Sequence, residues 1–483
     1  MGTVTIVGLG PGDARHLTRE AWTVLEEGRD LWLRTAHHPT VAALPTHLTV
    51  YAFDSLYESV EDFSQVYAAV ADQVLQLAQR PEGVIYAVPG HPFVGETTVK
   101  LIVERAAGAG LSVRVVEGLS FIEPVLTALR LDALAGLQVF DALELATCNH
   151  PPLNADVPAL VGQLYDRRLA ADVKLALMNE YPDEHPVTLI HAAGTPEART
   201  VTVPLYEMDW QDDIAHLTAL FIPPLASVSG FAAFQDTVAR LRAPDGCPWD
   251  REQTHESLRA TLLEETYEVA AAIDAGDIAD LEEELGDLLL QIVLHTQIAI
   301  EDGEFQMPDV IRGIDAKLKR RHPHVWGERS VTGTGEVLQR WEELKREEKG
   351  DVERSMLDSV PAALPALLQA DVYSQRVARV GFDWADLAGV AAKVREEIAE
   401  LDAAETPEER EAELGDLLFA AVNWARWLGV EAETALRKAN MRFASRFRRM
   451  EKAARERTLN LGDLTPAELD VLWQQAKRDE EAA

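Results

Sequence analysis

Paired carboxylates in the C-terminal half of the chain are the residues best suited to do chemistry. Two acidic stretches, EETYE (264–268) and EELGDLL (283–289), carry acids three residues apart, so each pair shares one face of a helix. The four acids of this pattern are Glu265, Glu268, Glu284 and Asp287. Two such helices packed antiparallel bring four repelling carboxylates together. A hard divalent cation relieves the repulsion, and oxygen-only ligands favour Mg²⁺, with Mn²⁺ as the alternative ion.

The same pattern occurs a second time in EEIAE (396–400) and AELGDLLF (412–419). The corresponding acids are Glu397, Glu400, Glu413 and Asp416. Surface acids that pair with Lys and Arg explain one isolated EExxE motif well. They do not explain two motifs that recur in the same order, so the sequence predicts an internal duplication with a metal site in each copy.

A basic stretch follows each copy, DAKLKRR (315–321) and LRKANMRF (436–443). Lys438 and Arg442 are four residues apart and share a helix face, with Asn440 near the same end. Mg²⁺ usually takes substrate phosphates as ligands, and cations clamp the phosphates that the metal does not reach. The pattern therefore predicts hydrolysis of a substrate with adjacent phosphates, with one metal-free carboxylate as general base.

Small and apolar residues between the acids predict how the acidic helices pack. Gly286 and Gly415 each cost about 1 kcal/mol relative to Ala inside a helix. The close approach of a neighbouring helix would justify this cost. The leucines beside the acids are expected to belong to the core, and they are Leu285, Leu288, Leu289, Leu414, Leu417 and Leu418.

The elements that position these residues differ between the two halves of the chain. Up to about residue 225, strand-like and helix-like segments alternate, which predicts an α/β domain with a largely parallel sheet. The expected strands are 4–9, 84–88, 113–117, 173–178, 187–193 and 217–224. The stretch IPPLASVSG (222–230) predicts a linker. Residues 231–483 have the periodicity of amphipathic helices.

Three glycine turns follow expected strands of the N-terminal half: GLGPGD (8–13), VPGHPFVGE (88–96) and EGLSFIEP (117–124). The first is a poor dinucleotide fingerprint, because Asp13 replaces the third glycine and Pro11 lacks the N–H that a pyrophosphate needs. Turns at the ends of parallel strands meet at one edge of the sheet. The three turns therefore predict a ligand crevice at its carboxyl edge.

Composition excludes several classes of protein. The formal charge of −36 makes polymeric nucleic acid an improbable partner. Two cysteines, Cys148 and Cys247, do not form a disulfide framework and indicate a reducing compartment, so we expect a cytoplasmic protein. The N-terminus has no basic n-region, and no apolar run is long enough for a membrane helix.

The C-terminal half resembles the MazG family of tandem all-α nucleoside triphosphate pyrophosphatases. The resemblance covers 231–483 and rests on GCPWDREQTHESL, LLEETYEV, EELGDLL, KLKRRHPHVWG, AELGDLLFAAVNWAR and KANMRF. It implies Mg²⁺-dependent hydrolysis of a nucleoside triphosphate to the monophosphate and diphosphate, in a homodimer. It further implies that the second copy is the active one, with Glu397, Glu400, Glu413 and Asp416 as metal ligands and Lys438, Asn440 and Arg442 on the substrate. The first copy keeps its acids, so its activity stays open.

The N-terminal half resembles the tetrapyrrole methylases, which bind S-adenosylmethionine between two α/β subdomains. The resemblance spans about residues 3–224 and rests on VTIVGLGPGD, YAVPGHP and VVEGLSFIEP. It implies a cofactor site lined by Pro11, Gly90, His91, Pro92, Phe93, Ser120, Phe121 and Met178. His91 replaces the aspartate of the Gly-Asp-Pro turn found in porphyrin and corrin enzymes, which leaves the methyl acceptor open.

The order of the parts resembles the bimodular YabN-type family. We expect a methylase-like domain at 1–225 and two MazG modules at 226–350 and 351–483. Two other functions stay open: a tetrapyrrole methyltransferase with a regulatory or structural helical half, and a binding protein in which neither half catalyses a reaction.

Overall fold

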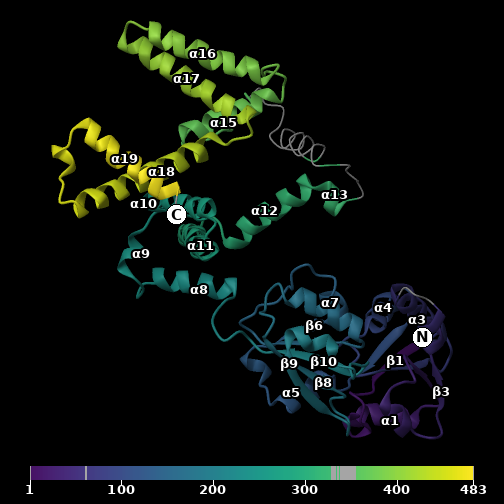
Figure 1. Ribbon diagram of the computed structural model, residues 1–483. Helices are drawn as coiled ribbons and strands as arrows, with labels where there is room; N and C mark the ends of the chain where they lie inside the picture. The colour runs from purple at the N-terminus through teal and green to yellow at the C-terminus, as the bar shows by residue number, and fades with distance from the viewer. Residues whose placement is uncertain (1, 60–62, 328–332, 334–336, 338–354, 482–483) are drawn as a thin grey trace. The chain divides into compact units, whose positions relative to one another are not determined.

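The computed structural model describes residues 2–59, 63–327, 333, 337 and 355–481 (Figure 1). The chain divides into two compact units, unit 1 (Met1–Glu252) and unit 2 (Gln253–Ala483). Unit 1 contains two β-sheets, and the described residues of unit 2 form helices. Within the described residues, no helix is both long and apolar enough to cross a membrane.

The first sheet of unit 1 is parallel, as the alternation of strands and helices predicts. Its order is β3-β2-β4-β1-β5, with the strands β1 (Thr3–Gly8), β2 (Asp30–Leu33), β3 (Thr49–Ala52), β4 (Val84–Val88) and β5 (Ser112–Val116). Alternate residues of β1 face opposite sides of the sheet. Ile6 packs on the side of α3 (Phe63–Leu77) and α4 (Thr97–Ala106), and Val7 packs on the side of α1 (Arg19–Glu27).

The second sheet is mostly antiparallel, so the expectation of a largely parallel sheet is wrong for this half of unit 1. Its order is β6-β7-β10-β8-β9, with the strands β6 (Gln138–Asp141), β7 (Ala159–Gly162), β8 (Pro186–His191), β9 (Arg199–Pro204) and β10 (Thr218–Ile222). Only the β6–β7 pair is parallel. The reason is local, because β8 and β9 are joined by a short connection that folds back as a hairpin.

The apolar stretch 173–178, expected to be a strand, is instead part of helix α7 (Arg167–Leu177). Asp166 caps its N-terminus by accepting a hydrogen bond from the backbone N–H of Leu169 at 2.8 Å. The buried residues of α7 are Leu169, Ala170, Val173, Ala176 and Leu177. Their spacing is helical, but a six-residue window is too short to show it.

Unit 1 also contains α2 (Asp54–Ser59), α5 (Ile122–Leu129), α6 (Ala142–Leu145), α8 (Phe231–Arg242), α9 (Pro248–Glu252) and short 3₁₀ turns. The change from strands to helices comes after β10, near the predicted boundary at 225. By contacts, α8 and α9 group with unit 1. The predicted boundary between the helical modules, at 350, lies outside the described residues.

Unit 2 is built from helical hairpins. Its helices are α10 (His255–Ala275), α11 (Ile278–Asp302), α12 (Met307–Arg321), α13 (Pro323–Trp326), α15 (Ala366–Ala378), α16 (Leu387–Ala403), α17 (Pro407–Trp427), α18 (Ala432–Glu456) and α19 (Pro466–Glu481). α10 packs against α11, and α16 packs against α17 (Figure 1). Gly276 ends α10 in the left-handed conformation and Asp277 caps α11, which makes a tight antiparallel turn.

Two packing expectations for unit 2 are wrong within a single chain. Apart from the backbone of its own helix, a Cβ atom built on Gly286 or Gly415 meets no described atom within 4 Å, so no described helix approaches closely there. Several leucines beside the acids are about half exposed rather than in a core, and they are Leu285, Leu289, Leu414 and Leu418. Each hairpin covers only one side of its helices, so the opposite apolar side faces outward.

Candidate metal and cofactor sites

The hairpin of α10 and α11 brings three of the four predicted acids of the first copy together. One ligand atom from each of Glu265, Glu268 and Glu284 lies within 4.8 Å of the others, and these residues form the first cluster. Asp287 lies outside this group, but its charge still acts on Glu265. Among the described residues, no ion pair reaches any of these four carboxylates.

The hairpin of α16 and α17 repeats this arrangement with Glu397, Glu413 and Asp416, which form the second cluster and meet the same 4.8 Å limit. Glu400, one turn after Glu397, lies outside the group. Glu397 is buried, and its carboxylate accepts a contact from the Lys393 ammonium at 2.7 Å. Sequence reasoning overlooked Lys393, although its position four residues before Glu397 could have revealed the pair.

Crowding of like charges changes the acidity of both sites. Burial, followed by the charges of Asp287, Glu268 and Glu284, raises the pKa of Glu265. Burial and then neighbouring carboxylates also raise the pKa of Glu284. For Glu400, burial and the charge of Glu397 raise the pKa, while Lys393 opposes the rise. Carboxylates held together against this repulsion suit a hard divalent cation, so the residues of both clusters fit Mg²⁺.

The predicted phosphate-binding residues lie on α18. The Lys438 ammonium is 3.3 Å from Asp274 of α10, and the neighbouring Arg437 guanidinium contacts the same carboxylate at 2.7 Å. Asn440 and Arg442 are exposed. Within the described part of the chain, no ion pair or hydrogen bond joins these α18 residues to the second cluster. A single chain therefore assembles the carboxylates but does not bring the basic helix onto them.

In unit 1, the three glycine turns meet, as their positions after β1, β4 and β5 predict. The backbone N–H of Gly90 donates to the Gly10 carbonyl at 2.8 Å, and Gly10 donates back to Gly90 at 3.2 Å. A Cβ atom on Gly8 or Gly118 would lie 2.6 or 2.5 Å from the Gly90 carbonyl oxygen. Only glycine fits at this crossing, because any side chain would push the turns apart.

A cavity of about 940 Å³ opens beside these turns, between the two sheets of unit 1. Five of the predicted cofactor residues line it: Pro11, Gly90, His91, Phe93 and Phe121. The other three, Pro92, Ser120 and Met178, are not among its lining residues. Ser120 is buried and donates its hydroxyl to Glu123 at 2.6 Å, and Met178 packs against the core of the second sheet.

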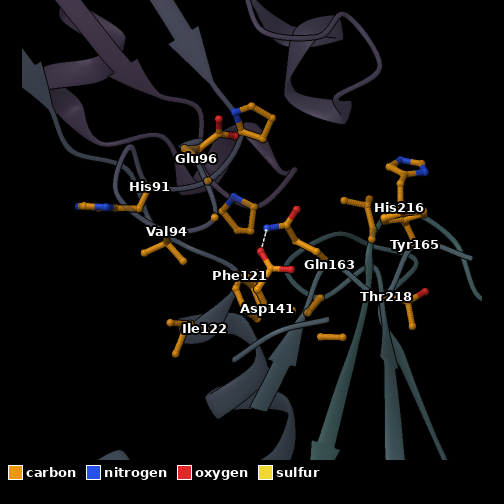
Figure 2. Close-up of a pocket in the computed structure, with 18 of the residues that line it drawn as sticks. His91, Val94, Glu96, Phe121, Ile122, Asp141, Gln163, Tyr165, His216 and Thr218 are labelled. Atoms are coloured by element: carbon orange, nitrogen blue, oxygen red, sulfur yellow. Dashed lines mark hydrogen bonds between the residues drawn. The ribbon is translucent and has the colours of Figure 1, made fainter. Parts of the chain in front are cut away.

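Polar residues that sequence reasoning overlooked also line the cavity. In Figure 2, the side chain of Gln163 reaches toward Asp141, and its Nε2 donates to the carboxylate at 2.6 Å. Glu96 is buried 3.2 Å from Nε of Arg34. Burial raises the pKa of Glu96 to about 7, and Arg34 opposes the rise. Burial lowers the pKa of His38 to about 4, so this histidine is neutral at pH 7.

The comparisons with known proteins divide the chain in the same way. Residues 3–209 match the family of tetrapyrrole (corrin/porphyrin) methylases, and residues 253–326 match the MazG nucleotide pyrophosphohydrolase domain. The second match contains the first cluster.

Individual relatives cover the whole chain or one of its halves. The uncharacterized protein YabN of Bacillus subtilis (strain 168) is 41% identical over 488 residues, which cover 99% of this chain and 99% of that protein. The nucleoside triphosphate pyrophosphohydrolase/pyrophosphatase MazG of Thermotoga maritima is 45% identical over 251 residues, covering 52% of this chain and 97% of the relative. A crystal structure of uroporphyrin-III-C-methyltransferase from Thermus thermophilus is 22% identical and covers 46% of this chain and 94% of its own, with a TM-score of 0.38.

Identity over nearly the full length of both chains decides the family. The relative from Bacillus subtilis shares the complete order of the two parts, and the matched segments begin and end in separate units of the structure. The chain belongs to the bimodular YabN-type family, in which a tetrapyrrole methylase domain precedes a MazG domain.

Proposed function

We propose that unit 2 is a Mg²⁺-dependent nucleoside triphosphate pyrophosphohydrolase, which converts a triphosphate and water to the monophosphate and diphosphate. The observation that carries this proposal is the gathering of acids by each helical hairpin into a cluster within 4.8 Å. The activity for which the MazG relative from Thermotoga maritima is named supports the same reaction. Like charges held this close repel one another, and a bound divalent cation would relieve that repulsion.

The carboxylates would act in two ways. Glu397, Glu413 and Asp416, with Glu400 beside them, would hold the ion, and Mn²⁺ is the alternative. The ion supplies charge neutralisation for the phosphates and acidifies a bound water. A neighbouring carboxylate without a bond to the metal would take the proton from the attacking water. Lys438, Asn440 and Arg442 are proposed to contact the substrate, with Lys438 also stabilising developing charge.

We further propose that the active form is a homodimer. Unit 2 exposes apolar side chains at helical spacing, and on α12 these are Val310, Ile311, Ile314 and Leu318. Similar exposed leucines flank both clusters. Extended apolar surface of this kind marks a binding face, and a second copy of unit 2 offers the matching face. A partner would also provide a second set of basic helices.

Pyrophosphate release from a panel of nucleoside triphosphates tests the hydrolase. The full-length protein is incubated with each triphosphate in Mg²⁺, in Mn²⁺ and with a chelator. We expect the monophosphate and diphosphate in equal amounts with either metal and none with the chelator. Release of orthophosphate, or no product with any triphosphate, would reject the proposal.

For unit 1 we propose binding of S-adenosylmethionine, because the cavity beside the glycine turns is lined by residues of the methylase pattern. The turns meet where β1, β4 and β5 end, and Pro11 and Gly90, beside and at the crossing of Gly10 and Gly90, line the cavity. Asp141 offers a carboxylate to a cationic sulfonium or ammonium. Calorimetry of the full-length protein with the cofactor should show one site per chain; no heat at millimolar ligand would contradict binding.

We also place the protein in the cytoplasm. Both cysteines are free thiols, and nucleoside triphosphates and S-adenosylmethionine are made there. Cell fractionation with an antibody against the chain tests this location.

A further inference from the structure

The two clusters differ in one residue that acts directly on the proposed metal ligands. On α16, the Nζ atom of Lys393 lies 2.7 Å from Oε1 of Glu397 and 2.8 Å from Oε1 of Glu396. The side chain of Glu397 is only 5% exposed. The second cluster therefore already contains a cation, held against its most buried carboxylate.

In the part of the chain that the structure describes, the first cluster has no such cation. Thr261 lies one helical turn before Glu265, in the place that Lys393 takes before Glu397. A threonine hydroxyl carries no charge and is too short to span this separation. Among the described residues, no Lys, Arg or His forms an ion pair with Glu265, Glu268 or Glu284. The negative charge of the first cluster is thus unmatched.

This difference changes what a divalent ion gains on entering each cluster. In the first, the ion relieves the repulsion of three carboxylates and displaces nothing. In the second, it must share Glu397 with the Lys393 ammonium or displace it. The pair is more costly to break than a surface pair, because one partner is buried. The flexible stem of lysine lets the ammonium leave without moving the helix.

We propose that Lys393 sets the order of metal affinity in unit 2, so that free divalent ions fill the first cluster before the second. The proposal rests on the proposed function, because it takes both clusters as metal sites. A consequence follows for the second cluster. Its metal would arrive most readily together with the triphosphate, whose negative charge gives the displaced ammonium a new partner.

Titration of the full-length protein with Mn²⁺ alone, without nucleotide, tests the order. Calorimetry should reveal one tighter and one weaker Mn²⁺ site per chain. Electron paramagnetic resonance, which measures the free Mn²⁺, should give the same two sites. Glu265→Gln should remove the tighter site and Glu413→Gln the weaker one, which assigns each site to its cluster.

Reciprocal substitutions then remove the lysine from the second cluster and introduce one at the matching position of the first. Lys393→Thr should tighten the weaker site by about tenfold, and Thr261→Lys should weaken the tighter site by a similar factor. Lys452→Thr, at an exposed position on α18, changes the net charge equally and should leave both sites unchanged. Circular dichroism of each variant checks that the helices still form.

The outcomes separate the inference from the function on which it rests. If Mn²⁺ binds at both clusters but Lys393→Thr leaves the weaker site unchanged, the role of Lys393 is wrong and the metal sites stand. If Lys452→Thr has the same effect as Lys393→Thr, net charge and not the Glu397 pair decides the affinity. If no variant binds Mn²⁺, the metal sites themselves are rejected, and the inference with them.

Discussion

Unit 1 gathers its candidate site within one chain, whereas the described residues of unit 2 do not join the basic helix to the carboxylate clusters. In unit 1, the two sheets flank a cavity, and three glycine turns lie in close contact beside it. In unit 2, the hairpins gather carboxylates but expose the leucines beside them, and the basic helix α18 pairs with Asp274 instead. A sheet with helices on both faces buries its own apolar surface, whereas a two-helix hairpin buries only one stripe.

The largest expected effect follows removal of two acids of the second copy. Glu397→Ala with Glu400→Ala should lower Mg²⁺-dependent pyrophosphate release by about 1000-fold or more, since the site loses two of its four proposed metal ligands. The affinity for S-adenosylmethionine should not change, because unit 1 completes its site alone.

The matched double variant of the first copy, Glu265→Ala with Glu268→Ala, shows which module is active. Retained activity there agrees with a catalytic second copy. Full activity in the Glu397 and Glu400 variant, with loss in this one, would move the catalytic site to the first copy.

Charges placed on the apolar face of α12 should impair unit 2 without impairing unit 1. Ile311→Glu with Ile314→Glu buries two carboxylates at the proposed dimer contact and should weaken self-association by about 100-fold or more. Sedimentation should then show single chains, and pyrophosphate release should fall. Leu134→Glu is the control, because Leu134 is 96% exposed in unit 1. A wild-type protein that sediments as a single active chain would contradict the dimer.

A side chain at the glycine crossing should affect unit 1 alone. Gly118→Val would place Cβ 2.5 Å from the Gly90 carbonyl oxygen, so the turns must separate. We expect cofactor binding to weaken at least about tenfold and unit 1 to lose about 2 kcal/mol of unfolding free energy. Calorimetry and thermal unfolding measure both effects.

The exposed Gly108 offers a control for that substitution, since the nearest atom to a new Cβ there is 3.6 Å away. Gly108→Ala should change neither measurement. Equal losses in pyrophosphate release for Gly118→Val would show that the two units do not act independently.

The last predicted effect is a gradual pH dependence of the stability of unit 1. Burial raises the pKa of Glu96 from its ordinary 4.5 to about 7, against the opposing charge of Arg34. At a pH between these two pKa values, the Glu96 carboxyl has lost its proton in the unfolded chain and keeps it in the folded chain. The free energy of unfolding therefore falls as pH rises from about 4.5 to 7, by at most about 3 kcal/mol.

Glu96→Gln has no proton to lose and should remove this slope. Thermal unfolding at several pH values between about 5 and 8 measures this slope. The transition to follow is the unfolding of unit 1, which Gly118→Val also shifts. A slope that persists in Glu96→Gln would show that Glu96 stays ionised beside Arg34.

The sequence by itself determined the features that depend on short-range spacing. Acids at three-residue intervals on successive helices predicted that four acids gather in each copy, and three of the four do so in each. Glycines after apolar strands predicted turns that meet at one sheet edge, and Gly10 and Gly90 do meet there. Local geometry determines such features, because the helix period and the strand direction decide which side chains share a face.

Only the tertiary structure decided which segments pack against one another and which side chains stay exposed. The antiparallel second sheet, the helix at 167–177, the Glu96–Arg34 pair and the outward leucines depend on packing between segments far apart in the sequence. The contact of Lys393 with Glu397 was decided partly by the sequence and partly by the tertiary structure. The spacing of Lys393 from Glu397 is visible in the sequence, but only the folded hairpin buries Glu397 and holds it against α17. That burial turns an ordinary surface ion pair into a cation placed inside a proposed metal site.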